Sequence, residues 1–325
     1  MTKQYDVIIL GGGTSGTIAA IAAARNGAKT LVVERYGNLG GTAVFGIPFL
    51  GMYDGRDERV NAGIPQEFVE RMKKEGGALE GCFGGTWMDE QYRFSITPFE
   101  QETYKYVAQE MLLEAGAEIL FHSFVSDLTL KDGNIESVEI VNKSGKTRYG
   151  AKVFIDCTGD GDIAFRAGAP FMEKTAVQNA SILFKMGGVN MHRFYDALQK
   201  SEGVTGWGEW HNRVIIGKKL DTDEPGPIHL AGHFTGENGK EITFTAISII
   251  STEVYINASR TINVDATSAE DLSRAEISER RNVWNVTRVM MANVPGFEHS
   301  HLIYSSPVGI RESRNIRGEY VLQQE

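Results

Sequence analysis

Three glycines near the start of the chain have a spacing that suits phosphate binding. Residues 11–16 read GGGTSG and satisfy the pattern G-x-G-x-x-G with Gly11, Gly13 and Gly16. In this pattern the first glycine permits a tight turn, and the second lets backbone approach a pyrophosphate. The third allows close packing of a helix on a strand. The chemistry expected here is the binding of a dinucleotide through backbone N–H groups.

The flanking residues indicate the elements that position these glycines. An apolar strand at 7–10 runs into the turn, and a helix of small residues follows it. The N-terminus of that helix offers N–H groups and the positive end of its dipole to phosphates. A second apolar strand at 31–33 ends on Glu34, which is placed to accept hydrogen bonds from a ribose. The order strand, turn, helix, strand therefore predicts a dinucleotide-binding α/β domain.

A second candidate site follows a strand at 152–157 that is predicted to be buried, and residues 156–162 read DCTGDGD. Ligands bind at such carboxyl-terminal strand edges in open α/β sheets. The three carboxylates also suit calcium or magnesium, but the spacing of a helix–loop–helix calcium site is absent, so we predict no metal. Cys157 precedes the turn inside an apolar strand, which favours an inert buried thiol.

The composition limits the partners. The net charge of −9 argues against nucleic acid or an anionic membrane as the main partner, because both require clustered Lys and Arg. With two cysteines, Cys82 and Cys157, the chain has neither a four-cysteine iron–sulfur cluster nor a C-x-x-C dithiol, and it suits a reducing compartment. Because no stretch approaches the ~18–20 apolar residues that span a bilayer, we expect a cytoplasmic protein.

Three motifs, in their order along the chain, resemble those of FAD-dependent oxidoreductases of the glutathione-reductase-like flavoprotein superfamily. They are GGGTSG at 11–16 with Glu34 and Arg35, NLGGT at 38–42, and DCTGDGD at 156–162. More narrowly, the chain resembles the family that includes heterodisulfide-reductase-A-like proteins. The resemblance implies FAD as the cofactor. It also implies a Rossmann-like FAD-binding domain with a parallel sheet plus a β-hairpin or meander, and a second α+β substrate domain.

The resemblance also implies roles for individual residues. The implied FAD contacts are Gly11, Gly13, Thr14, Ser15 and Gly16 at the pyrophosphate, Glu34 at the adenosine ribose, Arg35 and the backbone of Val125 at the adenine, Gly40, Gly41 and Thr42 along the ribityl and pyrophosphate side, and Thr158, Gly159, Asp160 and Gly161 in a second flavin-contacting turn. In the segment GIRESR at 309–314, Arg311 is the candidate for contacting an anionic substrate or the reduced flavin. A guanidinium suits either, because it is always charged and can bind a carboxylate through two hydrogen bonds. As a surface ion pair, the same segment would contribute little.

The predicted domains are an FAD-binding domain at 1–178 with an excursion at 47–95, a substrate domain at 179–303, and a return segment at 304–325 directed toward the FAD domain. In the resembling family a glycine-rich strand and helix follow such a segment and close over the flavin. We therefore expect either a truncated chain or one that is completed by a partner chain. A homo-oligomer is a further possibility.

The local patterns predict further elements. Helices are expected at 65–75, at 96–117 with a capping box of Thr97 and Glu100, and at 268–293 with Thr267 or Ser268 as its cap. Strands are expected at 117–122, 135–141, 152–157, 241–249 and 253–258, with a hairpin turn at 131–134 and a further strand after residue 146. Aromatic and histidine residues in a loop-rich region are candidates for lining a substrate pocket or for ordinary packing: Trp207, Trp210, His211, His229 and His233.

The leading hypothesis is an FAD-dependent oxidoreductase that transfers hydride or electrons between a small-molecule substrate and flavin. The first turn alone also fits an NAD-dependent dehydrogenase, although TGDGD and NLGGT have no use there. Electron transfer in a heterodisulfide-reductase-like complex is a third hypothesis, weakened by the missing cysteine clusters. A fourth hypothesis is a truncated, non-catalytic nucleotide-binding fragment or subunit.

Overall fold

The computed structural model describes residues 3–51, 54, 58–78, 82–86, 93–172, 178–194, 215–216, 228–235, 241–250 and 252–320. Contacts between residues divide the chain into two compact units. The first unit comprises Met1–Val44, Tyr104–Gln178 and Arg311–Glu325. The second comprises Phe45–Thr103 and Asn179–Ile310. Each unit is therefore built from stretches that lie far apart in the sequence.

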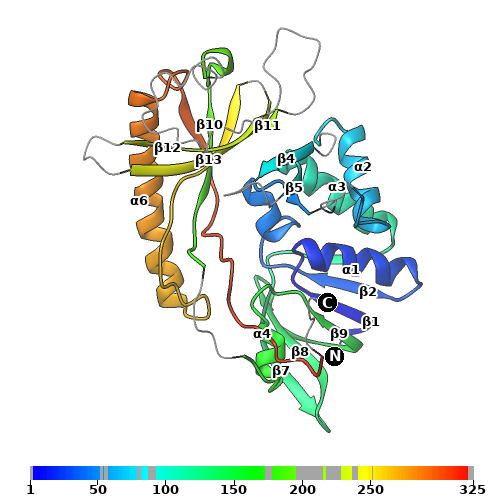
Figure 1. Cartoon of the computed structure of the whole chain (residues 1–325). Coiled ribbons are helices and arrows are strands. Elements are labelled where there is room, and N and C mark those ends of the chain that lie inside the picture. Colours follow the sequence, from blue (N-terminus) through cyan, green and yellow to red (C-terminus); the bar gives the residue numbers. More distant parts are fainter. Residues whose placement is uncertain are drawn as a thin grey trace. The chain divides into compact units, whose positions relative to one another are not determined.

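The first unit contains a sheet of six described strands in the order β6-β2-β1-β9-β8-β7 (Figure 1). The strands are β1 Lys3–Leu10, β2 Thr30–Val33, β6 Glu118–Leu120, β7 Phe124–Lys131, β8 Asn134–Asn142 and β9 Gly145–Asp156. Strands β6, β2, β1 and β9 pair in parallel, and β7, β8 and β9 form an antiparallel meander. The predicted fold class, a parallel Rossmann-like sheet extended by a hairpin, is confirmed.

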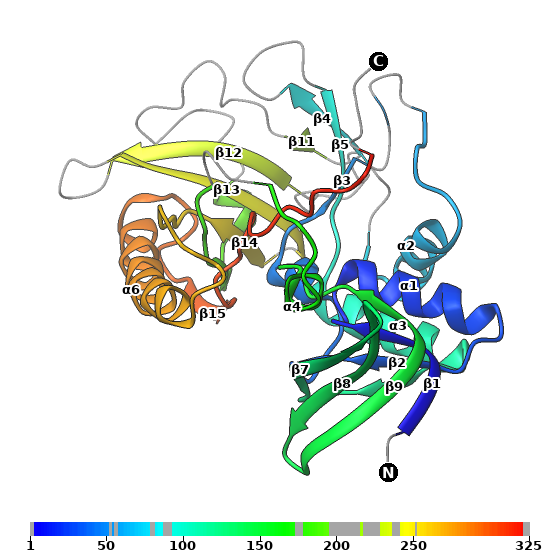
Figure 2. The same cartoon turned by 90° about the horizontal axis from the view of Figure 1, so that it is seen from below.

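Helix α1, Thr14–Arg25, begins directly after the glycine turn and contacts β1 and β2 (Figure 2). Its buried side is made of small residues together with Ile21, so the helix can lie close to the sheet. Ile8, Leu10, Leu31 and Val33 are buried in a cluster that contains no residue of α1 and includes Val138 and Ile140 of β8 instead. The contacts of α1 with β1 and β2 place its first turn at the ends of these strands.

Helix α3, Gln101–Glu114, is shorter than the helix predicted at 96–117. The predicted capping box is wrong, because Thr97 is the last residue of strand β5, Arg93–Thr97. The Glu100 N–H donates to the carbonyl of Gly77, and its carboxylate binds a lysine instead of capping the helix. The helix ends at Glu114, and Gly116 just after it has the left-handed φ of +85° that favours glycine.

Strand β9 is one continuous strand, whereas the sequence suggested two. Its first part, Gly145–Gly150, pairs with β8 and its second part, Tyr149–Asp156, pairs with β1, so a single strand serves both neighbours. The prediction that residues 152–157 are buried is also wrong, since Val153 is 50% exposed.

The second unit contains an antiparallel sheet of six described strands in the order β11-β12-β13-β14-β10-β15. The strands are β10 Leu183–Gly187, β11 Ile215–Ile216, β12 Ile228–Thr235, β13 Glu241–Ile250, β14 Glu253–Asn257 and β15 His301–Ser305. The predicted strands at 241–249 and 253–258 correspond to β13 and β14. Strand β15, an edge strand, was not predicted.

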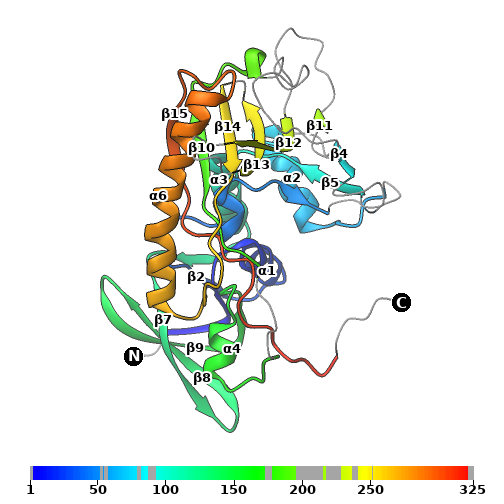
Figure 3. The ribbon, with the colours of Figure 1, turned by 60° about the vertical axis from the view of Figure 1, so that its left-hand side comes forward.

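Helix α6, Ala269–Asn293, runs along one face of this sheet (Figure 3). Its buried residues, among them Val283 and Met290, pack with Phe184 and Met186 of β10 and with Ile256 of β14. The side chain of Ser268 accepts a hydrogen bond from the Asp271 N–H at 3.3 Å, which confirms the predicted cap. This helix and sheet enclose the main core of the second unit.

The segment predicted as an excursion, 47–95, groups with the second unit. It forms a sheet of three described strands, β3 Phe49–Leu50, β5 Arg93–Thr97 and β4 Cys82–Thr86, together with helix α2, Ile64–Lys74. Trp207, Trp210 and His211 lie outside the described residues, and His229 and His233 are described only as backbone positions of β12. No helix among the described residues is long and apolar enough to cross a membrane.

Candidate functional site

The first turn of the nucleotide motif is built on two close backbone approaches. Gly11 has a φ of +105°, and a Cβ added to it would lie 2.2 Å from the carbonyl oxygen of Cys157. A Cβ added to Gly16 would lie 1.9 Å from the carbonyl oxygen of Gly11. Both positions therefore need glycine for the fold itself, Gly11 at the turn and Gly16 for the packing of α1 on β1.

Gly13 is different, because the protein does not fill the space beside it. It is the N-cap of α1, has an ordinary φ of −66°, and carries no side-chain cap. A Cβ added here would meet only the Cα of Gly41, at 3.9 Å. The side chains of Thr14 and Ser15 are exposed at this end of the helix. The first N–H groups of α1, which have no acceptor within the helix, thus face a space lined by glycine.

The NLGGT segment lies beside this turn. The Gly40 N–H donates to the carbonyl of Gly12 at 2.9 Å, and Gly13 and Gly40 form an isolated parallel bridge. Thr42 is exposed in the short helix η1, Gly41–Phe45. The structure therefore brings together the two glycine segments that the sequence predicted as one binding site.

Tyr104 supports both segments, a role the sequence analysis missed because the residue reads as part of an apolar helix stripe. A Cβ on Gly40 would lie 2.8 Å from its ring. Its hydroxyl is hydrogen-bonded to the side chain of Thr14, and burial raises the pKa of Tyr104 to about 12. Tyr104 therefore stays protonated at neutral pH and joins α3 to the first turn of α1.

Glu34 is held at the end of β2 with its side chain buried, 4% exposed. Its Oε2 accepts a hydrogen bond from the Gly12 N–H at 2.7 Å, and its Oε1 accepts one from the Tyr36 N–H at 2.8 Å. Each carboxylate oxygen has a further lone pair. The side chain is thus fixed in place and keeps the capacity to accept hydrogen bonds from sugar hydroxyls.

The predicted adenine residues lie next to this strand end. Arg35 is exposed, and its guanidinium carbon lies 4.9 Å from the centre of the Tyr36 ring. The Ser123 N–H donates to the carbonyl of Glu34 at 3.0 Å, which places the start of β7 at the end of β2. Val125 is in β7, paired with Ile140. The structure therefore groups Glu34, Arg35 and Val125 at one edge of the sheet.

The second turn leaves the strand next to β1. Leu10 and Asp156 are partners in the parallel β1–β9 ladder, so both turns start at the same carboxyl-terminal edge of the sheet. The Asp156 carboxylate accepts four hydrogen bonds, from the N–H and hydroxyl of Thr158 and from the N–H groups of Ile163 and Ala164. This aspartate shapes the turn and the start of helix α4, Asp162–Arg166, and has little capacity left for a ligand.

Asp160 and Asp162 are the other two carboxylates of this turn. Burial raises the pKa of Asp160, and nearby Ser313, Arg35 and Arg314 oppose that rise. The guanidinium of Arg314 donates to the carbonyl of Asp160 at 3.1 Å and to Oδ1 of Asp162 at 2.7 Å. Among the described residues, no group of three or more His, Cys, Asp or Glu is arranged to hold a metal ion.

Arg314 was missed at the sequence level, where Arg311 was the candidate. The side chain of Arg311 is exposed, whereas that of Arg314 is 17% exposed and lies over the Phe165 ring at 4.3 Å. The sequence shows two arginines in GIRESR, at 311 and 314, but their spacing does not indicate which of them faces the turn.

Comparison with known proteins decides the family. The family model described as FAD dependent oxidoreductase matches residues 6–325. The chain belongs to this family. FAD is therefore its cofactor, and the site fits the cofactor: glycine leaves space at the start of α1, and Glu34 and the second turn flank that space on neighbouring strands.

Curated relatives match parts of the chain. Thiamine thiazole synthase of Methanococcus vannielii is 32% identical over 164 residues, which cover 48% of this chain and 56% of that protein. Digeranylgeranylglycerophospholipid reductase 2 of Methanothermobacter thermautotrophicus is 26% identical over 256 residues, 75% of this chain and 65% of that protein. The chain thus spans about half to two thirds of the length of these relatives.

Solved structures share the fold. A geranylgeranyl bacteriochlorophyll reductase-like protein from Thermoplasma acidophilum is 16% identical with a TM-score of 0.53, over 95% of this chain and 66% of that one. A p-nitrophenol 4-monooxygenase from Pseudomonas putida is 13% identical with a TM-score of 0.54, over 97% of this chain and 72% of that one. At these identities the likeness shows the fold alone.

Cys157 lies between the two turns of this FAD family site. Its N–H donates to the carbonyl of Leu10 at 2.8 Å. Burial raises the pKa of its thiol, against a hydrogen bond to Ser15 that lowers it. The thiol is half-buried, whereas the sequence predicted burial, and its raised pKa favours the protonated form at neutral pH; the inert role stays a prediction.

The second unit contains a buried charged cluster that the sequence analysis missed. Lys185, 7% exposed, donates to Glu100 and to Glu253, both at 2.6 Å. Its ammonium lies 4.6 Å from the centre of the Tyr255 ring, and the Tyr255 hydroxyl donates to Glu100 at 3.4 Å. The sequence feature that could have revealed this cluster is a lysine between the apolar residues Phe184 and Met186. Because side chains alternate along a strand, Lys185 lies on the face of β10 opposite to α6.

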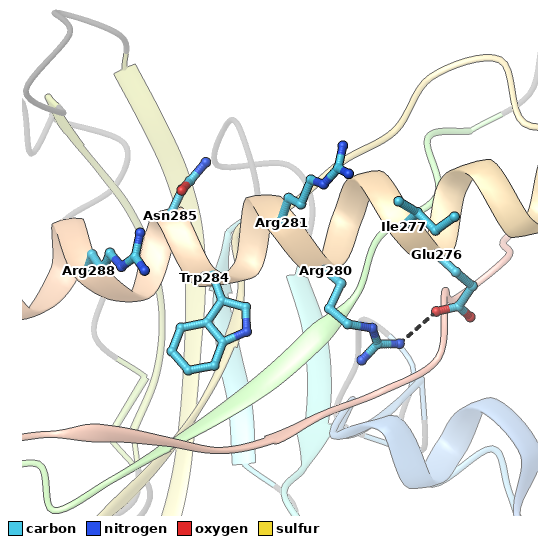
Figure 4. Close-up of a pocket in the computed structure, with 7 residues that line it drawn as sticks. All are labelled: Glu276, Ile277, Arg280, Arg281, Trp284, Asn285 and Arg288. Carbon is cyan, nitrogen blue, oxygen red and sulfur yellow. Dashed lines mark hydrogen bonds and ion pairs between the residues drawn. The ribbon is translucent and has the colours of Figure 1, made fainter.

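A separate pocket of about 500 Å³ lies on the outer face of α6 (Figure 4). It is lined by Glu276, Ile277, Arg280, Arg281, Trp284, Asn285 and Arg288. Figure 4 shows Glu276, Arg280 and Trp284 projecting from one side of the helix, with Arg281 and Asn285 on the other. The pocket contains none of the residues predicted to bind the cofactor, so we do not assign it to the FAD site.

Proposed function

We propose that the chain is an oxidoreductase that transfers hydride or electrons between a small-molecule substrate and bound FAD. The observation that carries the proposal is the space at Gly13. Its neighbours Gly11 and Gly16 are glycine because the fold requires it, but nothing in the described protein requires glycine at position 13. A glycine there is explained by a ligand whose phosphates reach the N–H groups of α1.

We assign the cofactor contacts as follows. The N-terminus of α1, from Gly13 to Gly16, binds the pyrophosphate, and Glu34 accepts hydrogen bonds from the adenosine ribose. Arg35 and the backbone of Val125 contact the adenine. Gly40–Thr42 and Thr158–Gly161 face the remainder of the cofactor. When bound, FAD supplies the electron-accepting ring, and the chain supplies binding, orientation and local charge.

The finer family assignment is also part of the proposal. The order GGGTSG, NLGGT, DCTGDGD favours the glutathione-reductase-like superfamily and its heterodisulfide-reductase-A-like members. The proposed domains are FAD-binding at 1–178, substrate-binding at 179–303 and a return segment at 304–325. Arg311 remains the proposed contact for an anionic substrate.

The test is to purify the chain, record its visible absorption spectrum, and repeat this after reconstitution with FAD and gel filtration. We expect protein-bound flavin that photoreduction bleaches and that an acceptor, oxygen or a protein partner, reoxidises. Absence of bound flavin after reconstitution would refute the proposal. Bound flavin that cannot be reduced would refute the redox activity while leaving the binding site in place.

A further inference from the structure

The return segment contacts the second turn through Arg314, and the contact has several components. One terminal nitrogen of the guanidinium donates both to the carbonyl of Asp160 and to the carboxylate of Asp162. The guanidinium also lies over the ring of Phe165 in α4. A single side chain thus binds the backbone, a charged group and an aromatic ring of one turn.

Neighbouring residues of the return segment are paired with the chain that follows this turn. The Met172 N–H donates to the carbonyl of Asn315 and the Arg317 N–H donates to the carbonyl of Pro170, both at 2.8 Å. Phe171 and Ile316 form an isolated antiparallel bridge. Figures 1 and 3 both show the red C-terminal segment passing α4. The position of Arg314 is therefore fixed by backbone pairing on its C-terminal side.

The charge of Arg314 matters because the turn is acidic. Asp160 and Asp162 lie within three residues, and FAD bound as proposed would add the negative charge of its pyrophosphate at the same sheet edge. Of the groups around Asp160, Arg314 and Arg35 are cationic, and Asp162 is a second anion. The guanidinium is 17% exposed and its partner Asp162 is 36% exposed, so solvent screens this pair only in part, and the contact with the Asp160 carbonyl adds to it.

We propose that Arg314 is a positioning residue for the cofactor: it holds the 158–162 turn in the conformation that receives FAD, so that cofactor retention depends on the return segment. This inference rests on the proposed function. Arg314 acts through Asp160 and Asp162, and it slows the dissociation of FAD because the turn must lose these contacts before it can open.

The experiment compares Arg314→Ala and Arg314→Lys with a matched control, Arg317→Ala. Arg317 is an exposed arginine three residues away that is paired through its backbone N–H, which alanine retains. Equilibrium titration with FAD and stopped-flow displacement measure affinity and dissociation rate. For Arg314→Ala we expect about 10- to 100-fold weaker binding, mostly through faster dissociation, because a hydrogen-bonded charged group is lost. Arg314→Lys should retain part of the affinity, and Arg317→Ala should stay within about twofold of the original protein.

Combining Arg314→Ala with Asp162→Asn tests whether Arg314 affects FAD dissociation through its contact with Asp162 or only by stabilising the fold. If Arg314 acts through Asp162, the effects of Arg314→Ala and Asp162→Asn on FAD dissociation are not additive in the double variant. Circular dichroism and thermal unfolding without FAD check the fold. Should Arg314→Ala fail to fold, Arg314→Lys and Asp162→Asn decide, and both must release FAD faster than the original protein.

Dissociation rates unchanged in these variants, or fully additive effects, would overturn the positioning role while leaving the proposed function intact. Failure of the original chain to bind FAD would instead refute the proposed function, and the role of Arg314 with it. The two failures are therefore distinguished by the unsubstituted protein.

Discussion

Two alanine substitutions in the same glycine motif should differ in their effect: Gly13→Ala should weaken cofactor binding without destabilising the fold, and Gly16→Ala should destabilise the fold. At Gly13 the backbone has φ −66° and ψ −169°, and the added Cβ meets nothing closer than 3.9 Å. At Gly16 the added Cβ would lie 1.9 Å from the carbonyl oxygen of Gly11 and 3.2 Å from the Cβ of Cys157. Gly13→Ala therefore leaves the protein's own packing intact, and Gly16→Ala forces α1 away from the sheet.

The magnitudes follow from these distances. Replacing glycine by alanine where the backbone allows it stabilises a protein by about 0.4–1 kcal/mol, because the unfolded chain loses freedom. Overpacking at Gly16 should cost about 1–3 kcal/mol, or a fall in Tm of roughly 2–12 °C. For FAD, a Cβ at position 13 occupies the space of the pyrophosphate, and the same overpacking cost corresponds to about 5- to 150-fold weaker binding.

Thermal unfolding without cofactor, followed by FAD titration of each variant, measures both quantities. We expect Gly13→Ala to unfold at or slightly above the Tm of the original protein and to bind FAD poorly. We expect Gly16→Ala to unfold at a lower temperature. Normal FAD affinity in Gly13→Ala would show that the pyrophosphate does not lie at the start of α1, and an unchanged Tm in Gly16→Ala would refute the packing argument.

Three further predictions concern single side chains. Glu34→Ala should lower the free energy of unfolding in urea by roughly 1–3 kcal/mol for each of the two backbone N–H groups that lose their acceptor, and an unchanged value would contradict this. Lys185→Met should lower the free energy of unfolding by roughly 2–4 kcal/mol at neutral pH, because Glu100 and Glu253 lose their cationic partner. Burial lowers the pKa of Lys185, but hydrogen bonds to two carboxylates raise it more, so its pKa is higher in the folded than in the unfolded protein. The stability advantage of the original protein over Lys185→Met should therefore persist to about pH 10 and fall at higher pH. Urea unfolding at several pH values measures this difference, and a difference that stays constant above that pH would contradict the prediction. Because burial raises the pKa of Cys157, iodoacetamide at about pH 7.5 should alkylate it at least about tenfold more slowly in folded than in urea-unfolded protein, as followed by peptide mass spectrometry; equal rates would contradict the inert assignment.

The order of elements around the nucleotide motif could be predicted because its causes are local. Gly11 and Gly16 are constrained by contacts within one strand–turn–helix unit and the adjacent strand exit. The spacing of the glycines reports those contacts directly. The roles of individual residues toward FAD remain predictions, since they concern the ligand.

Other features depended on partners far away in the sequence. Thr97 and Glu100 satisfy the capping-box pattern, yet Thr97 joins β5 and Glu100 binds Lys185, 85 residues later. Which arginine of GIRESR faces the second turn depends on backbone pairing at 315–317, which no local pattern reports. Tertiary pairing therefore decided the positions where local preference alone was insufficient.

The three-part composition of the first unit has a consequence for biosynthesis. Asp162 and Arg314, which contact each other, are 152 positions apart in the sequence. Gln178 and Glu312, which also contact each other, are 134 positions apart. At 5–20 residues per second, a ribosome needs roughly 8–30 s to synthesise the 152 residues of the larger separation. During that interval the glycine turns and their sheet have emerged without the segment that contacts the second turn, so completion of this unit must follow synthesis of the entire antiparallel sheet.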